Sequence, residues 1–483
     1  MYQEIAKYLN VASPPAEPTG LRNAILDFEQ HSIAQRPIAK MTTEIPAEEE
    51  RYLDFYTHKK DGTTKQTNPF TGTVVWTMPS RSVKRISANK KYVAGEHHGL
   101  KPLKDCVFCS ANYMETPPEK ARIVKGDNSL LRRIGPHEIF DTIAEFRRVP
   151  NLFELVSFDY WAKNYDYELS PDLEEHKSRY LSTATGREHV IRMIDLKLEH
   201  DVVPKGKIWA MSDAEKMIMA NAFFGGGHEL IIPERHTLLH DQTKVFSSGD
   251  MTPEEHYRYF CFTIDGIRDI FAHIRYAPYV SVFQNWLPEA GTSVEHLHKQ
   301  LVAIDDRGVA IRRELKQLRR NKNAYNDDAA NFAAYRNLML AENDHAIAFV
   351  DIGHRYPTVA IFSKSRNTRP QEHEDEEVRS VSDLVHACHA AIDRNIPCNE
   401  EWYYQPRDLS DPIPWHILIK WRPNVSAGFE GGTRIYINPI TPEDLRDQIV
   451  PKLFELKNSS KISTFPIAFE CSCETNCLRY VEG

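Results

Sequence analysis

The chain has 483 residues, of which 41% are hydrophobic and 27% are charged, so it is an ordinary globular protein long enough for two domains. A net charge of -8 argues against a basic face for nucleic acid or a membrane surface, and we expect small-molecule partners. The sequence shows no secretory signal and no membrane-spanning apolar run of roughly 18 residues, which favours a cytoplasmic protein with reduced cysteines.

The N-terminal part of the chain contains an extension, a metal-binding motif and an insertion. Residues 1–59 match no recognisable pattern, and we expect a partly helical extension there. Cys106 and Cys109 form a C-x-x-C pair, which places two thiolates on one tight turn and suits a zinc ion or, alternatively, a redox dithiol. No thioredoxin-like surroundings follow, which favours the metal. Residues 160–205, rich in charged and aromatic side chains, are expected to form a helical insertion.

The next element is an amphipathic helix that begins after Thr252. Thr252 is a suitable N-cap, Pro253 takes the first helical position, and Glu254 and Glu255 lie in the first turn. Apolar residues then recur at steps of three and four, at Tyr257, Phe260, Ile264, Ile267, Phe271 and Ile274. This pattern predicts a helix with one buried stripe.

The most informative motif follows a predicted strand at residues 279–286 and a small-residue turn at 290–292. His296, His298 and Gln300 alternate in a segment that we predict to be a strand, where every second side chain shares a face. An imidazole can bind a metal, act as a general base or attack phosphorus, and a carboxamide can hydrogen-bond a phosphate oxygen. We therefore predict a functional site; the alternative is one packed and one solvated histidine beside an incidental glutamine.

The C-x-x-C pair supplies only half of a structural zinc site, which usually has four nitrogen or sulfur ligands. The sequence has no second C-x-x-C pair, so we expect histidines to complete the set. His296 and His236, which ends the segment 229–236, are the best placed. The predicted metal ligands are therefore Cys106, Cys109, His236 and His296, with Zn²⁺ as the cofactor.

The second half of the chain repeats the order of elements found in the first. A helix is predicted at 382–394, a strand at 401–405 and a further strand at 415–420. Duplication of one unit explains both halves. We predict an α+β protein with two tandem domains at 60–330 and 331–465, each an antiparallel sheet with packed helices, of which the first carries the chemistry.

Two further segments have compositions of their own. Residues 306–344 contain many arginines and lysines, and we expect an exposed basic helix; a solvated face is preferred over a phosphate-facing lid. Residues 466–483 form a polar C-terminal tail with Cys471, Cys473 and Cys477. Reduced, unstructured thiols are preferred there over a second metal site.

Several short motifs occur in the order of a known family. They are N-P-F-T-G at 68–72 and the basic run at 79–85, the C-x-x-C block extending to 119, V-P-N-L-F at 149–153, H-E-L-I-I at 228–232, W-H-I at 415–417, A-G-F-E-G-G-T at 427–433 and Y-I-N at 436–438. Together they resemble the galactose-1-phosphate uridylyltransferase family of the histidine-triad (HIT) superfamily, which also contains dinucleoside polyphosphate phosphorylases. The resemblance implies two HIT-like domains and a homodimer.

The resemblance also implies a double-displacement reaction. His298 would attack the α-phosphorus of a nucleoside diphosphate sugar, release a sugar 1-phosphate, and hold the nucleotide until a second sugar 1-phosphate takes it. The implied catalytic residues are His298, Gln300 and Ser293, while zinc at His296 aims the nucleophile. The implied substrate-binding residues are Arg81, Arg85, Phe283, Asn285, Gly291, Thr292, Phe429 and Glu430.

The sequence departs from the family pattern in three places. Lys299 replaces the glycine of H-P-H-G-Q, and strand alternation points it away from His298. In the second half only His416 remains of an H-x-H motif, which puts in doubt the iron site of some members. Residues 424–427 depart from the sugar-contacting pattern, so the sugar stays open. Two alternatives fit the same residues: a dinucleoside polyphosphate phosphorylase or hydrolase, and a catalytically silent nucleotide-binding protein.

Overall fold

A computed structural model describes residues 52, 54–87, 105–423 and 427–481. The chain divides into two compact units, and nearly all described residues belong to the second, Asp54–Gly483. Most of the extension predicted at 1–59 lies outside the described residues, although its end forms strand β1 (Tyr56–His58). No helix in the described ranges is long and apolar enough to cross a membrane.

The framework is an antiparallel sheet of eleven strands, filled largely by the β-branched and aromatic residues that favour pleated, buried surfaces. In spatial order the strands are β12 (Met339–Glu342), β13 (Ala346–Asp351), β14 (Thr358–Ser363), β16 (His416–Trp421), β15 (Cys398–Tyr403), β10 (Tyr279–Trp286), β11 (Lys299–Ile304), β7 (His228–Pro233), β6 (Ala144–Pro150), β4 (Ala121–Val124) and β5 (Leu130–Arg132).

The two halves of this sheet have the same topology. The order β6-β7-β11-β10 in one half matches β13-β14-β16-β15 in the other, and one long helix lies between the second and third strands of each unit. β10 and β15 pair at the centre, with Phe283 opposite Glu401, so the two units share one sheet. This confirms the predicted duplication of an α+β unit.

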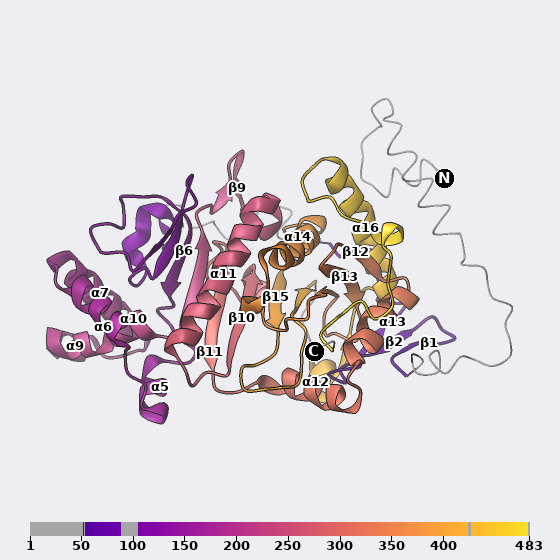
Figure 1. Cartoon of the computed structure of the whole chain (residues 1–483), viewed down its shortest axis with the longest axis horizontal. Coiled ribbons are helices and arrows are strands. Elements are labelled where there is room, and N and C mark those ends of the chain that lie inside the picture. The colour runs from indigo at the N-terminus through magenta and orange to yellow at the C-terminus, as the bar shows by residue number, and fades with distance from the viewer. Residues whose placement is uncertain (1–51, 53, 88–104, 424–426, 482–483) are drawn as a thin grey trace. The chain divides into compact units, whose positions relative to one another are not determined.

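The two long helices, α11 (Pro253–His273) and α14 (Asp375–Ala391), lie side by side across the sheet (Figure 1). The predicted cap is present, because the Thr252 hydroxyl accepts a hydrogen bond from the Glu255 amide at 3.2 Å. The buried surface of α11 is broader than the predicted stripe, since the sheet and α14 cover it from two sides; Tyr259, Phe262 and Ile270 are also buried. α14 begins before the predicted 382, where Glu374 and Glu377 form a capping box.

The predicted insertion is helical and continues beyond residue 205. Its helices are α5 (Phe158–Tyr165), α6 (Pro171–Leu181), α7 (Ala184–His200), α8 (Lys205–Ala210), α9 (Asp213–Met219) and α10 (Asn221–Gly225). Helices α6 to α10 share a small apolar core of their own, which includes Val190, Met193 and Phe224. In Figure 1 the group lies at the β6 end of the framework.

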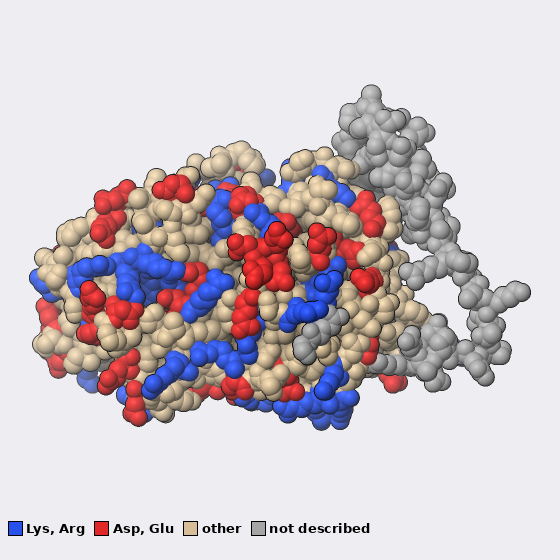
Figure 2. Space-filling view, in the orientation of Figure 1, with Lys and Arg blue, Asp and Glu red and all other residues tan. Residues whose placement is uncertain are grey.

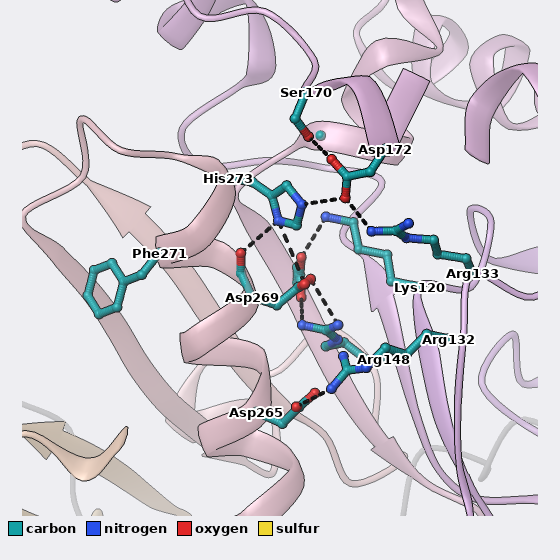
Figure 3. A network of polar contacts seen from close by, with 12 residues as sticks. Lys120, Arg132, Arg133, Arg148, Ser170, Asp172, Asp265, Asp269, Phe271 and His273 are labelled. Carbon is teal, nitrogen blue, oxygen red and sulfur yellow. Dashed lines mark hydrogen bonds and ion pairs between the residues drawn. The ribbon is translucent and has the colours of Figure 1, made fainter. Parts of the chain in front are cut away.

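A polar network joins this insertion to the sheet (Figure 3). Asp172 of α6 accepts a hydrogen bond from Nε2 of His273 on α11 at 3.2 Å. One turn earlier on α11, Asp269 pairs with buried Arg148 at 2.9 Å. Arg148 also reaches Glu229 of β7 at 3.4 Å. The network therefore holds β7 in place from the helix-covered face of the sheet.

A smaller sheet consists of β1, β2 (Thr64–Thr67), β3 (Val74–Thr77) and β17 (Ile435–Ile437), with β17 parallel to β3. It joins the N-P-F-T-G segment to the second half, where Asn68 Nδ2 donates to the Ile352 carbonyl at 2.9 Å. Two helices flank β17, α15 (Gly428–Thr433) and α16 (Pro442–Asn458). The segment assigned by sequence to the first domain thus packs against the second.

The basic helix predicted at 306–344 is shorter than expected: α12 spans Gly308–Arg320, and most of the residues at 324–333 and all at 338–342 are buried. Ile311, Leu315 and Leu318 are buried under it, and its arginines and lysines are exposed. In Figure 2 Lys and Arg gather at the lower edge, where Figure 1 places α12. Several are already engaged: Arg312 pairs with Asp306 at 2.9 Å and Arg319 with Asp411 at 2.9 Å. These contacts agree with the solvated-face interpretation.

The remaining described elements are short. They are η2 (Ser110–Glu115), β8 (Thr237–Leu238), β9 (Asp241–Val245), η3 (Ser248–Asp250), η4 (Pro288–Ala290), η5 (Asn326–Ala330), α13 (Asn331–Tyr335), η6 (Pro370–Glu372) and η7 (Ala468–Glu470).

The C-terminal tail differs from its prediction as an unstructured segment. Leu478 and Tyr480 are buried, and the Leu478 backbone exchanges two 2.9 Å hydrogen bonds with the Asn326 side chain. Apolar burial and backbone pairing therefore fix the tail against the η5 region. Its cysteines are not part of any metal-ligand cluster in the described part of the chain.

Candidate functional site

The four predicted metal ligands come together. Cys106, Cys109, His236 and His296 each offer one ligand atom, and these atoms lie within 4.8 Å of one another. The Cys106 Sγ lies 3.6 Å from His296 Nδ1, and the Cys109 Sγ lies 3.4 Å from His236 Nδ1 and 3.8 Å from His296 Nδ1. Tetrahedral zinc, with bonds of about 2.3 Å to sulfur and about 2.0 Å to nitrogen, places such atoms about 3.5 Å apart. The cluster therefore fits a metal of this kind.

Backbone contacts orient the ligands before any metal binds. His296 Nε2 donates to the Pro233 carbonyl at 2.8 Å, which leaves the lone pair on Nδ1, the nitrogen that faces the thiols. Asn112 Nδ2 donates to the Cys106 carbonyl at 2.8 Å and closes the C-x-x-C turn. Cys106 and His296 are buried, so the donor set is shielded from bulk water.

His298 lies beside this cluster with a defined tautomer. Its Nδ1 lies 2.8 Å from the His296 carbonyl, which can only accept, so Nδ1 carries the hydrogen and Nε2 keeps its lone pair. Burial lowers the pKa of His298 to about 4, which keeps the ring neutral near pH 7. The edge of Phe108, from the C-x-x-C turn, contacts the ring with centroids 5.2 Å apart. The C-x-x-C turn therefore helps to hold the His298 ring in place.

The strand that carries the motif begins later than predicted. β11 starts at Lys299, so His296 and His298 precede it. The His296 carbonyl, which a continuing strand would direct to a neighbouring strand, accepts from the His298 ring instead. The backbone turns here to bring His296 to the thiols, and only Gln300 lies on the regular strand.

Gln300 is held by a histidine of β7. His228 Nδ1 accepts from the Leu155 amide at 3.1 Å, so Nε2 carries the hydrogen and donates to the Gln300 Oε1 at 3.0 Å. Burial lowers the pKa of His228 to about 4, which preserves this neutral form. The Gln300 NH₂ group is thereby left to donate to a ligand.

Lys299 points to the other face of the sheet, as strand alternation predicts. It forms an ion pair with Glu400 of β15, and both side chains are fully buried. Glu400 also accepts from His389 Nε2 at 2.9 Å and from Trp402 Nε1 at 2.6 Å. The residue that departs from the family pattern therefore joins β11 to the second half, directly behind His298.

The predicted nucleotide-side residues lie at the end of β10 and in the following turn. Phe283 is opposite Gln300 in the strand pairing. The Asn285 Oδ1 accepts from Asn399 Nδ2 at 2.7 Å. Gly291, at φ +97°, adopts a left-handed conformation that L side chains rarely take, and it lies next to the Asn285 amide.

Two polar side chains follow that glycine. The Thr292 hydroxyl donates to the Val294 carbonyl at 2.7 Å, and Ser293 is exposed. Their part in binding a phosphate stays a prediction.

The remaining predicted substrate residues lie with the second half. Exposed Arg81 and Arg85 follow β3, and this segment reaches α16 through the hydrogen bond between the Ile86 amide and Gln448 Oε1 at 2.9 Å. Phe429 is 47% exposed on α15, whereas Glu430 is buried and caps that helix through the Ala427 amide. Residues 424–426, part of the departing segment, lie outside the described residues.

Sequence reasoning did not assign two residues of this site. Phe108 is the second x of C-x-x-C and looks like ordinary core, and His228 was noted only as part of H-E-L-I-I. No alternating pattern singles out His228, because it shares a strand face with Leu230 and Ile232 and every residue of β7 is buried. Its contact with Gln300 depends on the pairing of β7 with β11, where His228 is opposite Val302.

A family model described as a domain of unknown function, DUF4921, matches residues 59–480. The chain belongs to this family. Among curated proteins, an ADP-glucose phosphorylase of Arabidopsis thaliana is 23% identical over 175 residues, which are 35% of this chain and 50% of that protein. The chain thus matches about half the length of this curated relative.

Two solved structures share the fold of this DUF4921 protein. A crystal structure of an ADP-glucose phosphorylase from Arabidopsis thaliana with bound ADP-glucose has a TM-score of 0.51 and 18% identity, covering 80% of this chain and 98% of that one. A GalT-like protein from the same plant has a TM-score of 0.50 and 17% identity, covering 83% and 99%. The expected fold, that of GalT-like proteins, is confirmed.

Proposed function

We propose that this DUF4921 protein is a nucleotidyltransferase that uses His298 as its nucleophile and a nucleoside diphosphate sugar as its donor. The observation that carries the proposal is the ring of His298. Its Nδ1 is committed to a backbone carbonyl, its pKa is low, and its Nε2 lone pair is left for phosphorus. A histidine needed only for packing has no requirement for this arrangement.

The reaction has two balanced steps. His298 Nε2 attacks the α-phosphorus, the bond between that phosphorus and the bridging oxygen breaks, and a sugar 1-phosphate leaves with the bridging oxygen. An acceptor phosphate oxygen then attacks the same phosphorus, and the phosphorus–nitrogen bond breaks to restore the neutral ring. Division into two displacements lowers each barrier. The hydrogen bond from Nδ1–H to the His296 carbonyl stabilises the positive charge that develops on the ring in the first step.

Negative charge on the transferring phosphate is met by hydrogen-bond donors. The Gln300 NH₂ is the best placed, because His228 fixes the carbonyl end of the same amide. The backbone around Gly291 and the Ser293 hydroxyl are proposed to donate to the remaining oxygens. Phe283 and Asn285 are proposed to contact the nucleoside.

The acceptor separates two candidate reactions. In the first, a second sugar 1-phosphate takes the nucleotide. In the second, inorganic phosphate takes it and yields a nucleoside diphosphate. The name ADP-glucose phosphorylase, given to the curated relative and to the crystal structure from Arabidopsis thaliana, and the ADP-glucose bound in that structure support an ADP-sugar donor and a phosphate acceptor.

The metal is proposed to be a structural zinc held by Cys106, Cys109, His236 and His296. When bound, zinc ties the C-x-x-C turn to the segment before β11. Two contacts connect these ligands to His298: Phe108 packs against the His298 ring, and the His296 carbonyl fixes the tautomer of His298. The polar networks behind β7 and β11 hold the two strands on which these groups depend.

Arg81, Arg85, Phe429 and Glu430 are proposed to contact the diphosphate and the sugar. The strand order places β16, next to their small sheet, three strand spacings from β11, or about 14 Å. A homodimer, expected from the family, would offer these residues to the site of a second copy.

The test is a search for nucleotidylated protein. The native protein is mixed with ADP-glucose, UDP-glucose, UDP-galactose, GDP-mannose or diadenosine tetraphosphate, and intact mass and peptide mapping locate the label. We expect one nucleoside monophosphate on His298, released by inorganic phosphate or a sugar 1-phosphate. His298→Ala should take no label, and His240→Ala, which alters an exposed histidine near β8, should label normally.

Each other outcome has a definite meaning. Tight nucleotide binding without label or turnover supports the catalytically silent alternative and refutes the transferase. Label on a different residue refutes the assignment of His298. Label from diadenosine tetraphosphate alone favours the polyphosphate phosphorylase or hydrolase.

A further inference from the structure

The second half contains a polar cavity that is separate from the site at His298. Its volume is about 190 Å³, and residues of the N-P-F-T-G loop, α12, β16 and β17 line it. On the same scale a single water needs only roughly 10–15 Å³, so the cavity has room for a ring-sized molecule. β15 and β10 lie between β16 and β11 in the sheet, so the two sites occupy different strands.

His416 occupies the position in this cavity that His298 occupies in the first half. It begins β16 as His298 immediately precedes β11, and its Nδ1 donates to the Pro414 carbonyl at 2.9 Å. The ring is stacked between Phe362, with centroids 4.4 Å apart, and Tyr403, at 5.2 Å. With Nδ1 committed, Nε2 is a hydrogen-bond acceptor, and no described group donates to it.

Glu314 of α12 presents a second acceptor to the same cavity. It is only 5% exposed, and its Oε2 accepts from the Tyr325 hydroxyl at 2.8 Å. No described group donates to its Oε1. A buried carboxyl with an unused oxygen is costly unless something donates to it. Burial also raises its pKa to about 7, which shows how poorly the surroundings solvate its charge.

Two charged pairs that line the cavity are neutralised internally, and Arg355, which also lines it, lies over the Tyr436 ring at 5.5 Å from the centroid. Asp351 pairs with His354 at 2.7 Å, and Lys420 pairs with Glu401 at 2.6 Å. The position two residues after His416 is Leu418, where the first half has Gln300, so the amide donor for a phosphate is missing. The cavity therefore lacks the amide donor that a second transfer reaction of the same kind would use.

We propose that this cavity binds the hydroxyl-bearing ring of a sugar. Hydroxyl groups donate to Glu314 Oε1 and His416 Nε2, and the C–H face of the ring packs on the aromatic side chains of Phe70 and Tyr436. Two sources share this chemistry, a hexose and the ribose of a nucleoside. The proposal does not depend on the nucleotidyl transfer proposed above.

The test measures binding to the full chain in a His298→Ala background, which removes covalent chemistry. The probes are glucose, glucose 1-phosphate and adenosine, followed by isothermal titration and by ligand-observed NMR. Glu314→Gln places an amide donor where the acceptor was, and we expect at least tenfold weaker binding of whichever probe binds. His416→Phe keeps the aromatic stack, removes Nε2 and should have a similar effect. Glu376→Gln on the exposed start of α14 is the matched control and should bind normally.

The outcomes decide the proposal and its source. Preference for glucose or glucose 1-phosphate identifies a hexose, and preference for adenosine identifies a ribose; either supports the cavity as a sugar site. The proposal is overturned if no probe binds at concentrations up to about 10 mM. Binding that is unchanged in Glu314→Gln also overturns it, because the probe then occupies another site. Unfolding curves show whether each variant is folded. If His416→Phe does not fold, the result for Glu314→Gln, which retains an oxygen for Tyr325, decides the test.

Discussion

The buried ion pair of Lys299 and Glu400 predicts a large loss of stability when Lys299 is replaced, although a lysine would ordinarily be expected at the surface. The pair is fully buried, and the Lys299 ammonium lies 5.0, 4.9 and 5.3 Å from the ring centroids of Tyr259, Phe260 and Trp402. Burial alone would raise the pKa of Glu400, but the attraction of Lys299 and the hydrogen bond from His389 hold it below its ordinary value. Loss of the cation leaves a buried carboxylate without its main partner.

We expect Lys299→Met to lower the free energy of unfolding by about 3 kcal/mol. Removal of one partner of a buried ion pair costs about 3–5 kcal/mol, and the lower end applies because Glu400 keeps its hydrogen bonds from His389 and Trp402. Methionine retains the apolar stem, so the change reports the charge. Adding Glu400→Gln to Lys299→Met should recover at least half of the loss, because no uncompensated charge then remains.

The assay is urea unfolding of the native protein, both single variants and the double variant at pH 7.5, followed by tryptophan fluorescence. Lys316→Met, on the exposed face of α12, is the control and should change the free energy by less than about 0.5 kcal/mol. The reasoning is refuted if Lys299→Met lies within 1 kcal/mol of the native protein, or if the effects of the two single variants simply add.

Three further predictions concern the metal, the glutamine and pH. Cys106→Ser should lose bound metal and unfold at a lower temperature, whereas His298→Ala should keep its metal; the reverse in elemental analysis would mean that the two roles are exchanged. His228→Phe should lower kcat by about 10- to 100-fold with little change in KM, because the Gln300 amide loses its orientation. His228→Gln keeps a donor and should recover most of the lost kcat. Equal losses in both variants would contradict a positioning role. Burial lowers the pKa of three structural histidines to about 4, namely His176, His189 and His386. As pH falls, the unfolded chain protonates these rings at a higher pH than the folded chain does. The free energy of unfolding should therefore fall as pH drops from 6.5 towards 4, by up to about 1.4 kcal/mol per pH unit for each ring. Urea unfolding curves that coincide at pH 7.5, 6 and 5 would exclude this.

The elements that sequence predicts best are those whose signals are local. The α11 helix has its cap, its proline and its first-turn acids within four residues, and all of them act in the structure as the pattern indicates. The Cys/His cluster is predictable for a related reason. Two thiols on one turn leave few candidates for the other donors, and the histidines that complete the set belong to short, distinctive motifs. Duplication of the unit is visible as a repeated order of elements.

Other features depend on strand pairing between distant segments, which no local pattern encodes. Lys299 meets Glu400 only because β10 pairs with both β11 and β15, and His228 reaches Gln300 only because β7 lies against β11. The end of the chain shows the same limit, since its polar composition predicts a free tail while Leu478 and Tyr480 find a buried place beside η5.

By itself, then, the sequence determined the duplicated α+β architecture and the four members of the Cys/His cluster, and it singled out His298 as the proposed nucleophile, because each depends on residues that are close together or chemically rare. Tertiary structure alone decided which tautomer His298 adopts, which residue holds Gln300, and that the second half keeps a cavity around His416 and Glu314. The physical reason is that hydrogen-bond partners, burial and the pKa shifts they cause belong to pairs of segments brought together by the sheet, and not to either segment alone.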